Sequence, residues 1–453
     1  MNIIFIVIDT LRKDYSTAIE NELKRLGFTT YENTIAPSSW TIPTHASIFT
    51  GLYPALHDAH ETKNKKIPHI KLKSSDNLIS LQVKDLGYET KLLTANPFIR
   101  PSFGFTGFDY FYEVSHIPTF RILSSSEREI INTLIQKYQL NGTSDIIRAI
   151  ISQGYYKLLL KASLKMLIKR PYLSLWKYYH IIFENWPTDK GAKRIVNTLK
   201  KITKTTSTTT QKFIFMNLME VHEPYYKSYD PHTIVKGLKR GKFETNEIQK
   251  WKEGYCREIK YITTKILDII HVLKERGLFR NSLIIITSDH GQLLGEYGKL
   301  GHGTFLYDEL LRVPLLIKYP EDHPINHEPE ELKYISLTKL KQFIFAIINN
   351  QITSDTMLYD DTVFAESYGI QENVGKMTSD EEKKNIEQLE KYRLAIYYKN
   401  FKGIFNVTDW KFEEIISYNP KIEVTEDIIK HMKKEVVKFL KTATVAKVPK
   451  IKI

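Results

Sequence analysis

Four short strand-like runs constrain the fold of this chain more than any other feature of its sequence. They span residues 3–8, 88–94, 212–218 and 282–287. The first is continuously apolar, the last has the apolar centre Leu-Ile-Ile-Ile, and both are rich in β-branched residues. Such strands are usually buried on both faces, as in a parallel sheet covered by helices. The runs therefore predict an α/β fold with a mixed, mainly parallel sheet sandwiched by helices.

Helical patterns fill the stretches between the strands, as a doubly wound sheet requires. Three of them, at residues 21–26, 78–86 and 247–276, lie close to the predicted strands. Four more indicate a helical insertion over about residues 117–210, and they span 127–138, 144–168, 172–184 and 191–202. The insertion interrupts a main domain of residues 1–375.

The last part of the chain has a pattern of its own. Residues 392–406 alternate like a β-hairpin, and residues 425–441 have the spacing of a basic amphipathic helix. These two features predict a small C-terminal α+β subdomain over residues 376–453.

Chemically capable side chains follow all four strands. Asp9 ends the first strand and Asn96 follows the second. His222 follows the third, and Asp289 and His290 follow the fourth. Carboxyl ends of parallel strands meet at one edge of the sheet, where such sheets bind ligands. An aspartate and a histidine can share one divalent cation, although turns also use these residues routinely.

The segment Thr41–Gly51 combines a rigid proline turn with a predicted helix whose start carries several hydroxyls. A helix N-terminus presents free backbone N–H groups and a positive dipole end, which suit a tetrahedral oxyanion. The simpler interpretation is that these hydroxyls only cap the helix.

Charge and cysteine content limit the partners. The chain has 65 Lys+Arg against 52 Asp+Glu, a net charge of +13. Residues 148–204 alone hold 13 basic and 2 acidic residues, a net charge of +11. This segment favours peripheral contact with an anionic membrane or a polyanion, with no specific recognition of nucleic acid, and the alternative is a solvated lid. A single cysteine excludes an internal disulfide framework and a cysteine zinc site.

The N-terminal apolar run ends at once in Asp9, and no stretch of about 18 uncharged apolar residues occurs. We therefore expect a cytoplasmic protein with no spanning helix.

Taken together, these motifs resemble the sulfatase branch of the alkaline phosphatase superfamily. The similar blocks occur in the family's order and cover about residues 2–115 and 212–345. They read VIDTLRKD, SSWTIPTHASIFTGLYP, GYETKLLTANPF, FMNLMEVHEPY and ITSDHGQLLGEYGKLGHGTFLYDELLRVPLLI. The C-terminal hairpin is similar to a degenerate form of the family's C-terminal subdomain. The resemblance implies an alkaline-phosphatase-like fold and the hydrolysis of an anionic ester.

The resemblance also implies a role for individual residues. Asp9, Asp289 and His290 match metal ligands, and Thr41 matches the nucleophile, which also contacts the metal. Substrate contacts are implied for Asn96, for His302 toward anionic oxygens, and for His222 toward the leaving group. Lys299, which follows the Asp289-His290 pair at short range, is a further substrate-binding candidate. His45 stands where formylglycine-dependent sulfatases have arginine, and it is included among the catalytic candidates.

Two departures from the family pattern matter for the chemistry. Formylglycine forms from Cys or Ser in a Cys/Ser-x-Pro-x-Arg motif, and this chain has Thr41, Pro43 and His45 instead, with Cys256 far away. We therefore expect an unmodified Thr41 nucleophile, as in the superfamily's phosphoryl-transferring members. Thr10 follows Asp9 where a second aspartate would stand, which implies one divalent metal ion, either Mn, Ca, Mg or Zn.

Three functions remain open at this point. The first is a metal-dependent hydrolase of phosphate or sulfate esters, with phosphoesters or phosphodiesters favoured over sulfates. The second is a phosphoryl-group transferase acting on a sugar or lipid acceptor. The third is a catalytically silent protein that binds anions, because a fold does not guarantee an activity.

Overall fold

The computed structural model describes residues 1–453 except 74–76, 116–121, 139–141, 205–209, 226–232 and 444–453. The chain divides into two compact units. The main unit comprises Met1–Ser115 and Lys190–Ile453, and the helical unit comprises His116–Asp189.

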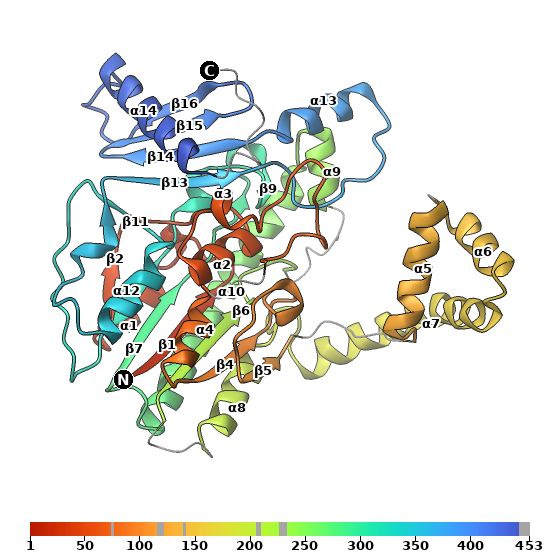
Figure 1. The fold of residues 1–453 in the computed structure, drawn as a ribbon, viewed down its shortest axis with the longest axis horizontal. Coiled ribbons are helices and arrows are strands. Elements are labelled where there is room, and N and C mark those ends of the chain that lie inside the picture. Colours follow the sequence, from red (N-terminus) through yellow and green to blue (C-terminus); the bar gives the residue numbers. More distant parts are fainter. Residues whose placement is uncertain (74–76, 116–121, 139–141, 205–209, 226–232, 444–453) are drawn as a thin grey trace. The chain divides into compact units, whose positions relative to one another are not determined.

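A seven-stranded sheet forms the centre of the main unit, with the strand order β2-β10-β7-β1-β6-β4-β5 (Figure 1). Strand β1 pairs in parallel with β6 and β7, β4 pairs in parallel with β6 and β5, and β10 is antiparallel to both of its neighbours. The strands are β1 (Asn2–Ile8), β2 (Thr29–Tyr31), β4 (Glu89–Thr94), β5 (Tyr110–Glu113), β6 (Lys212–Leu218), β7 (Ser282–Thr287) and β10 (Leu315–Lys318). The predicted mixed, mainly parallel sheet is confirmed.

Helices cover both faces of this sheet, because alternate residues of β1 enter two separate cores. Ile3, Phe5 and Val7 join the core under one set of helices, and the even-numbered Ile4, Ile6 and Ile8 join the other. The first set is α2 (Thr41–Thr50), α4 (Ile79–Asp85) and α12 (Lys339–Ile348). The second is α1 (Thr17–Lys24), α8 (Ala192–Ile202) and α10 (Thr245–Glu275).

An antiparallel sheet near the C-terminus has the order β13-β14-β15-β16 and packs against α14 (Glu426–Thr442) through Met432 and Val436. Its strands are β13 (Thr362–Ser367), β14 (Arg393–Tyr398), β15 (Phe401–Asn406) and β16 (Lys411–Ser417). The hairpin and the basic helix lie where the sequence predicted them. The subdomain boundary at 376 was too late, because β13 pairs along its whole length with β14.

Short elements complete the main unit. They are β3 (Thr34–Ile35), β8 (Leu293–Leu294), β9 (Leu300–Gly301), β11 (Tyr334–Ser336), β12 (Tyr359–Asp360), α3 (Pro54–His57), α9 (Thr233–Arg240), α11 (Asp308–Leu311) and α13 (Asp380–Leu389). Single-turn 3₁₀ helices span Lys13–Tyr15, Pro101–Phe103, Glu296–Gly298 and Thr356–Leu358.

The helical unit contains α5 (Ser125–Tyr138), α6 (Thr143–Ser152) and α7 (Tyr156–Phe183). We predicted a helix over 144–168 and a second one after Pro171. The break instead falls at Gly154, which has a φ of +72° that favours glycine, and α7 continues through Pro171. The predicted insertion also extended too far, because α8 buries Ala192, Ile195 and Leu199 in the core of the main unit.

Candidate active site

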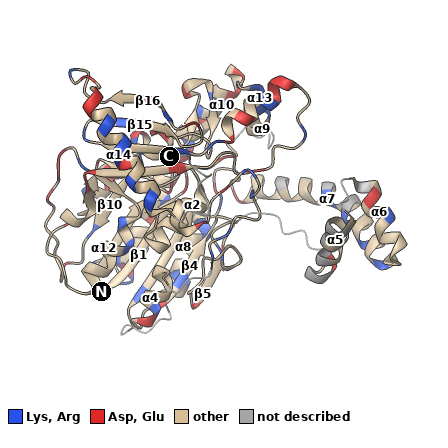
Figure 2. Ribbon diagram, turned by 45° about the horizontal axis from the view of Figure 1, so that its top comes forward, with Lys and Arg blue, Asp and Glu red and all other residues tan. Residues whose placement is uncertain are grey.

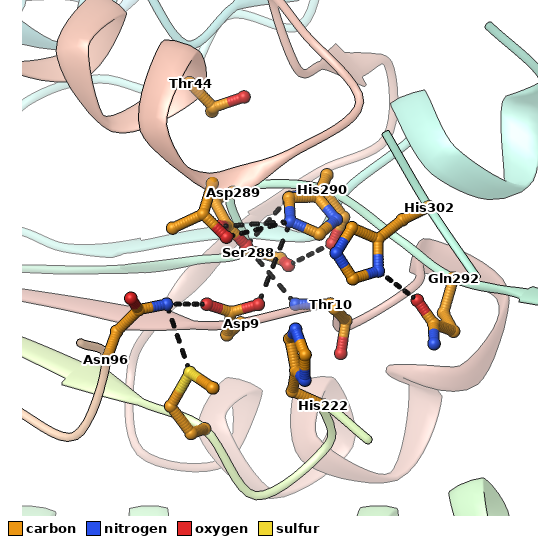
Figure 3. A network of polar contacts seen from close by, with 12 residues as sticks. Asp9, Thr10, Thr44, Asn96, His222, Ser288, Asp289, His290, Gln292 and His302 are labelled. Carbon is orange, nitrogen blue, oxygen red and sulfur yellow. Dashed lines mark hydrogen bonds and ion pairs between the residues drawn. The ribbon is translucent and has the colours of Figure 1, made fainter. Parts of the chain in front are cut away.

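The carboxyl ends of β1 and β7 bring three buried ligand-type side chains together. Val7 and Thr287 are paired in the sheet, so Asp9 and Asp289 emerge side by side. One ligand atom from each of Asp9, Asp289 and His290 lies within 4.8 Å of the other two. All three side chains are fully buried, and Figure 3 shows them pointing toward one another.

Hydrogen bonds orient this group so that lone pairs face its centre. His290 Nδ1 lies 2.9 Å from the Gly291 carbonyl, which can only accept, so Nδ1 carries the proton and Nε2 a lone pair. That Nε2 lies 3.8 Å from Asp9 Oδ1 and 3.4 Å from Asp289 Oδ2. Neither carboxylate oxygen has a hydrogen-bond partner among the described residues. Two buried carboxylate oxygens without donors, together with an imidazole nitrogen whose described hydrogen-bond partner is the Thr41 hydroxyl, fit a divalent cation.

Electrostatics support the same conclusion. Burial raises the pKa of Asp9 well above its usual value, and the neighbouring Asp289 raises it further. Burial also raises the pKa of Asp289 to about 7, although backbone N–H groups of Thr10 and His290 donate to its Oδ1. Burial lowers the pKa of His290 to about 3, so the imidazole is neutral. A bound cation would relieve the repulsion between the carboxylates, so the residues fit the implied metal.

Thr41 is the first residue of α2 and directs its hydroxyl at this group. Trp40 is extended and Thr41 begins the helix, which leaves the first N–H groups of α2 without intrahelical partners. Pro43 is tolerated in this first turn because the N–H that proline lacks would have no intrahelical hydrogen-bond partner there. Thr41 Oγ1 lies 3.3 Å from His290 Nε2, and its side chain is buried. The predicted nucleophile therefore lies next to the predicted metal ligands.

His45 lies one turn further along α2 and is fully buried. Its Nδ1 donates to the Thr41 carbonyl at 3.0 Å, and its Nε2 accepts from the amide Nδ2 of Asn217 at 3.2 Å. Burial lowers the pKa of His45 to about 4, so the ring is neutral. His45 Nδ1 also lies 3.5 Å from Asp289 Oδ2. These contacts suit a residue that positions Thr41 and Asp289.

Asn96, which is predicted to bind substrate, orients a metal-ligand candidate. Its amide Nδ2 donates to Asp9 Oδ2 at 2.7 Å, and its Oδ1 accepts from the backbone N–H of Phe98 at 2.8 Å. This arrangement holds one oxygen of Asp9 and leaves the other facing His290 (Figure 3).

His222 and His302 lie beside the metal-ligand candidates. Their ring centroids are 5.0 Å apart, and that of His302 is 4.6 Å from that of His290. Gln292 links the second histidine to Glu223, since its Oε1 accepts from His302 Nδ1 at 2.8 Å and its Nε2 donates to Glu223 Oε2 at 2.8 Å. His222, Glu223 and His302 each offer a ligand-type atom within 4.8 Å of the others.

The charges around these two histidines differ. Burial by itself would lower the pKa of His222, but the charges of Glu223 and Asp9 outweigh it and raise the pKa. Burial lowers the pKa of His302 well below its usual value despite the charge of Glu223. His222 is therefore the better proton donor of the pair.

Lys299 is the one predicted site residue for which the structure describes no contact with the other site residues. Its ammonium lies over the ring of Phe305, 4.9 Å from the centroid. Among its described contacts none is to Asp9, Thr41, Asp289 or His290, so the structure gives no support for a substrate contact by Lys299.

Sequence reasoning missed Asn217, Gln292 and Arg12. Arg12 braces the loop after β7 by donating to the Gln292 carbonyl at 3.0 Å and to Glu296 Oε1 at 2.7 Å. Gln292 directly follows the Asp289-His290-Gly291 motif, and this position could have indicated that it lies near the site.

The comparisons with known proteins agree with this fold. A protein-family model described as Sulfatase matches residues 1–340. The chain belongs to the sulfatase family, within the alkaline phosphatase superfamily.

Solved structures show the same fold at low sequence identity. The phosphonate monoester hydrolase of Agrobacterium radiobacter is 14% identical with a TM-score of 0.62, and the alignment covers 97% of this chain and 95% of that one. A protein solved in complex with its substrate D-glucosamine-2-N,6-O-disulfate is 12% identical with a TM-score of 0.62, and the alignment covers 99% of both chains. These likenesses establish the fold alone.

Two curated relatives match shorter segments. A low-salt glycan biosynthesis sulfotransferase from Haloferax volcanii is 34% identical over 96 residues, which are 19% of this chain and 24% of that protein. An N-acetylglucosamine-6-O-sulfatase from Bacteroides thetaiotaomicron is 33% identical over 73 residues, 16% of this chain and 13% of that one. The chain thus matches a quarter or less of the length of these relatives.

Proposed function

We propose that this protein is a metal-dependent ester hydrolase that uses unmodified Thr41 as its nucleophile and prefers phosphoesters or phosphodiesters over sulfates. One observation carries the proposal: the Thr41 hydroxyl is buried at the start of α2, 3.3 Å from Nε2 of His290, which groups with Asp9 and Asp289. Proton acceptors beside the hydroxyl favour its activation as a nucleophile. The free N–H groups at the start of α2 can bind an anionic ester next to it.

Asp9, Thr41, Asp289 and His290 would hold one divalent cation, either Mn, Ca, Mg or Zn. When bound, the cation would lower the pKa of the Thr41 hydroxyl and offset negative charge on the ester. Asn96 and His45 support this arrangement from outside, since Asn96 fixes one oxygen of Asp9 and His45 fixes the Thr41 carbonyl. Both are positioning residues.

His222 and His302, which lie beside the metal-ligand candidates, are the groups available for proton transfer and substrate contact. His222, whose pKa is raised by Glu223 and Asp9 against the effect of burial, would give a proton to the leaving-group oxygen. Gln292 Oε1 accepts from Nδ1–H of the neutral His302 ring, so His302 Nε2 carries a lone pair and can accept a proton or a hydrogen bond but cannot donate one to an anionic oxygen. The Thr41 hydroxyl would lose its proton to solvent and its oxygen would attack the phosphorus, while the bond from phosphorus to the leaving-group oxygen breaks and that oxygen takes the proton of His222. Water would then hydrolyse the ester on Thr41 and restore the hydroxyl.

A substrate panel tests the proposal. Chromogenic phosphate monoesters, phosphodiesters, phosphonates and sulfates would be assayed with each of the four metals, and intact mass would report the state of Thr41. We expect turnover of a phosphorus ester with no formylglycine mass change. Turnover of sulfates alone would contradict the substrate preference.

The phosphoryl-group transferase remains a second candidate, with a sugar or lipid as acceptor. The similarity to the Haloferax volcanii protein, which is named a sulfotransferase, is the observation that supports this second candidate. Product analysis with an added alcohol separates the two, because a transferase yields the transferred ester and a hydrolase yields the free acid. Retention of a metal with no turnover on any ester would instead support a silent anion-binding protein.

A further inference from the structure

Helix α7 presents an apolar face to solvent. Six of its large apolar side chains follow the spacing of one helical face, and each is at least 44% exposed. They are Leu160 (72%), Leu164 (44%), Leu167 (74%), Leu175 (71%), Tyr178 (67%) and Ile182 (68%). We call these six residues the outer stripe.

The outer stripe is not the face by which α7 packs in the helical unit. Leu158 and His180 are buried, and the ring of Trp176 contacts those of His180 and Trp186, with centroids 4.4 Å and 5.7 Å apart. These residues lie on the opposite side of the helix from Leu160 and Tyr178. The helix thus has two apolar faces, and only the inner one is used for packing within the described part of this unit.

Basic residues, coloured blue in Figure 2, also occur along α7, and helical spacing places Lys157 and Lys161 at one edge of the outer stripe. Lys157, Lys161, Lys165 and Lys169 repeat every four residues, and α7 contains no Asp or Glu. Long lysine stems can lie along apolar surface while the ammonium stays in water or meets an anionic headgroup. Tyrosines such as Tyr178 suit the same boundary because one end is apolar and the other polar.

We propose that the outer stripe of α7 binds the surface of an anionic lipid bilayer, with the helix lying in the plane of the headgroups. In the part of the chain that the structure describes, no helix is long and apolar enough to cross a membrane. A helix of 28 residues is about 42 Å long and can lie flat with its stripe among the upper acyl chains. A soluble polyanion would use the lysines and leave the leucines in water, so the stripe favours a bilayer. This inference does not depend on the proposed chemistry.

Vesicle co-sedimentation of the full chain tests the proposal. The vesicles are phosphatidylcholine alone or mixed with phosphatidylserine. The variant Leu160→Gln/Leu167→Gln/Leu175→Gln shortens the stripe, and Leu86→Gln/Leu332→Gln/Ile422→Gln, at exposed apolar positions of the main unit, is the matched control. We expect the stripe variant to bind mixed vesicles at least about tenfold more weakly, because the lost apolar transfer outweighs the retained charge.

A charge variant separates the two contributions. Lys157→Gln/Lys165→Gln/Lys169→Gln leaves Lys161, which pairs with Glu127 at 2.6 Å. We expect it to lose the preference for phosphatidylserine, and the wild type to bind mixed vesicles less tightly as salt rises. Turnover of a small soluble ester should stay unchanged in both variants, which also reports that they fold.

A fluorescent label locates the contact directly. Cys256 is the chain's only cysteine, so Leu167→Cys in a Cys256→Ser background carries one environment-sensitive dye, and Leu86→Cys in the same background is the control. The dye at position 167 should shift to the blue with mixed vesicles, and the control dye should not. Three results would each overturn the proposal: no binding to mixed vesicles, equal binding by the stripe variant, or no shift at position 167.

Discussion

Replacing Asp289 by Asn should stabilise the metal-free fold while it removes metal binding. Asp9 and Asp289 are both buried and carry oxygens without hydrogen-bond donors among the described residues. Asparagine has nearly the shape of aspartate, and its Oδ1 can still accept the hydrogen bonds from the backbone N–H groups of Thr10 and His290. Its amide nitrogen would take the place of Oδ2, which is 3.4 Å from the lone pair of His290 Nε2.

The magnitude follows from the raised pKa of Asp289. An unfolded aspartate loses its proton near pH 3.9, whereas burial holds the folded pKa at about 7. Between these values the native state binds more protons than the unfolded state, so the free energy of unfolding falls as pH rises. A shift of about 3 units at about 1.36 kcal/mol each costs the metal-free wild type about 4 kcal/mol above the folded pKa. We expect Asp289→Asn to recover about 2–4 kcal/mol of it.

Urea unfolding of chelator-treated wild type and Asp289→Asn, measured between mildly acidic and mildly alkaline pH, checks this prediction. The difference in free energy of unfolding should be small at acidic pH and grow as pH rises. Adding the cation should stabilise the wild type and leave the variant unchanged. A metal-free variant that is less stable than the wild type at alkaline pH would refute the account of a buried Asp289 carboxylate with a raised pKa.

Three further predictions concern activity. Chelation should abolish turnover and one of Mn, Mg, Ca or Zn should restore it, whereas full turnover after chelation would show that the site is misassigned. His222→Gln should slow an ester of a poor alcohol leaving group by about 10²–10⁴-fold and a nitrophenyl ester much less, and equal losses would contradict proton donation. Cys256 is exposed on α10, so Cys256→Ser should change stability by less than about 0.5 kcal/mol and leave turnover intact, as unfolding and kinetic assays would show.

The fold and the ligand candidates could be predicted because they depend on local patterns. Strand β1 is apolar on both faces, and this pattern is typical of a sheet that helices cover on both sides. Parallel pairing then brings Asp9 and Asp289 to one edge without any knowledge of the loops. The position of Thr41 followed from the proline turn and from the family resemblance.

The features that were not predicted depend mainly on contacts between residues far apart in the sequence. Asn217 lies on β6 and reaches His45 across 172 positions of sequence, and no local pattern marks such a pairing. The contact of Asn96 with Asp9 was missed for the same reason, because only the folded chain shows its amide turned toward Asp9. The helix break was misplaced because Pro171 is a stronger local signal than Gly154, yet a long helix can absorb one missing hydrogen bond.

Trapping the covalent intermediate tests the central claim most directly. The metal-loaded enzyme would be mixed with a phosphorus ester that it turns over, quenched in acid, digested and sequenced by mass spectrometry. The account predicts a phosphoryl adduct on the peptide that contains Thr41, absent in Thr41→Ala, whose turnover should fall by several orders of magnitude. An adduct on another residue, or full turnover by Thr41→Ala, would contradict it.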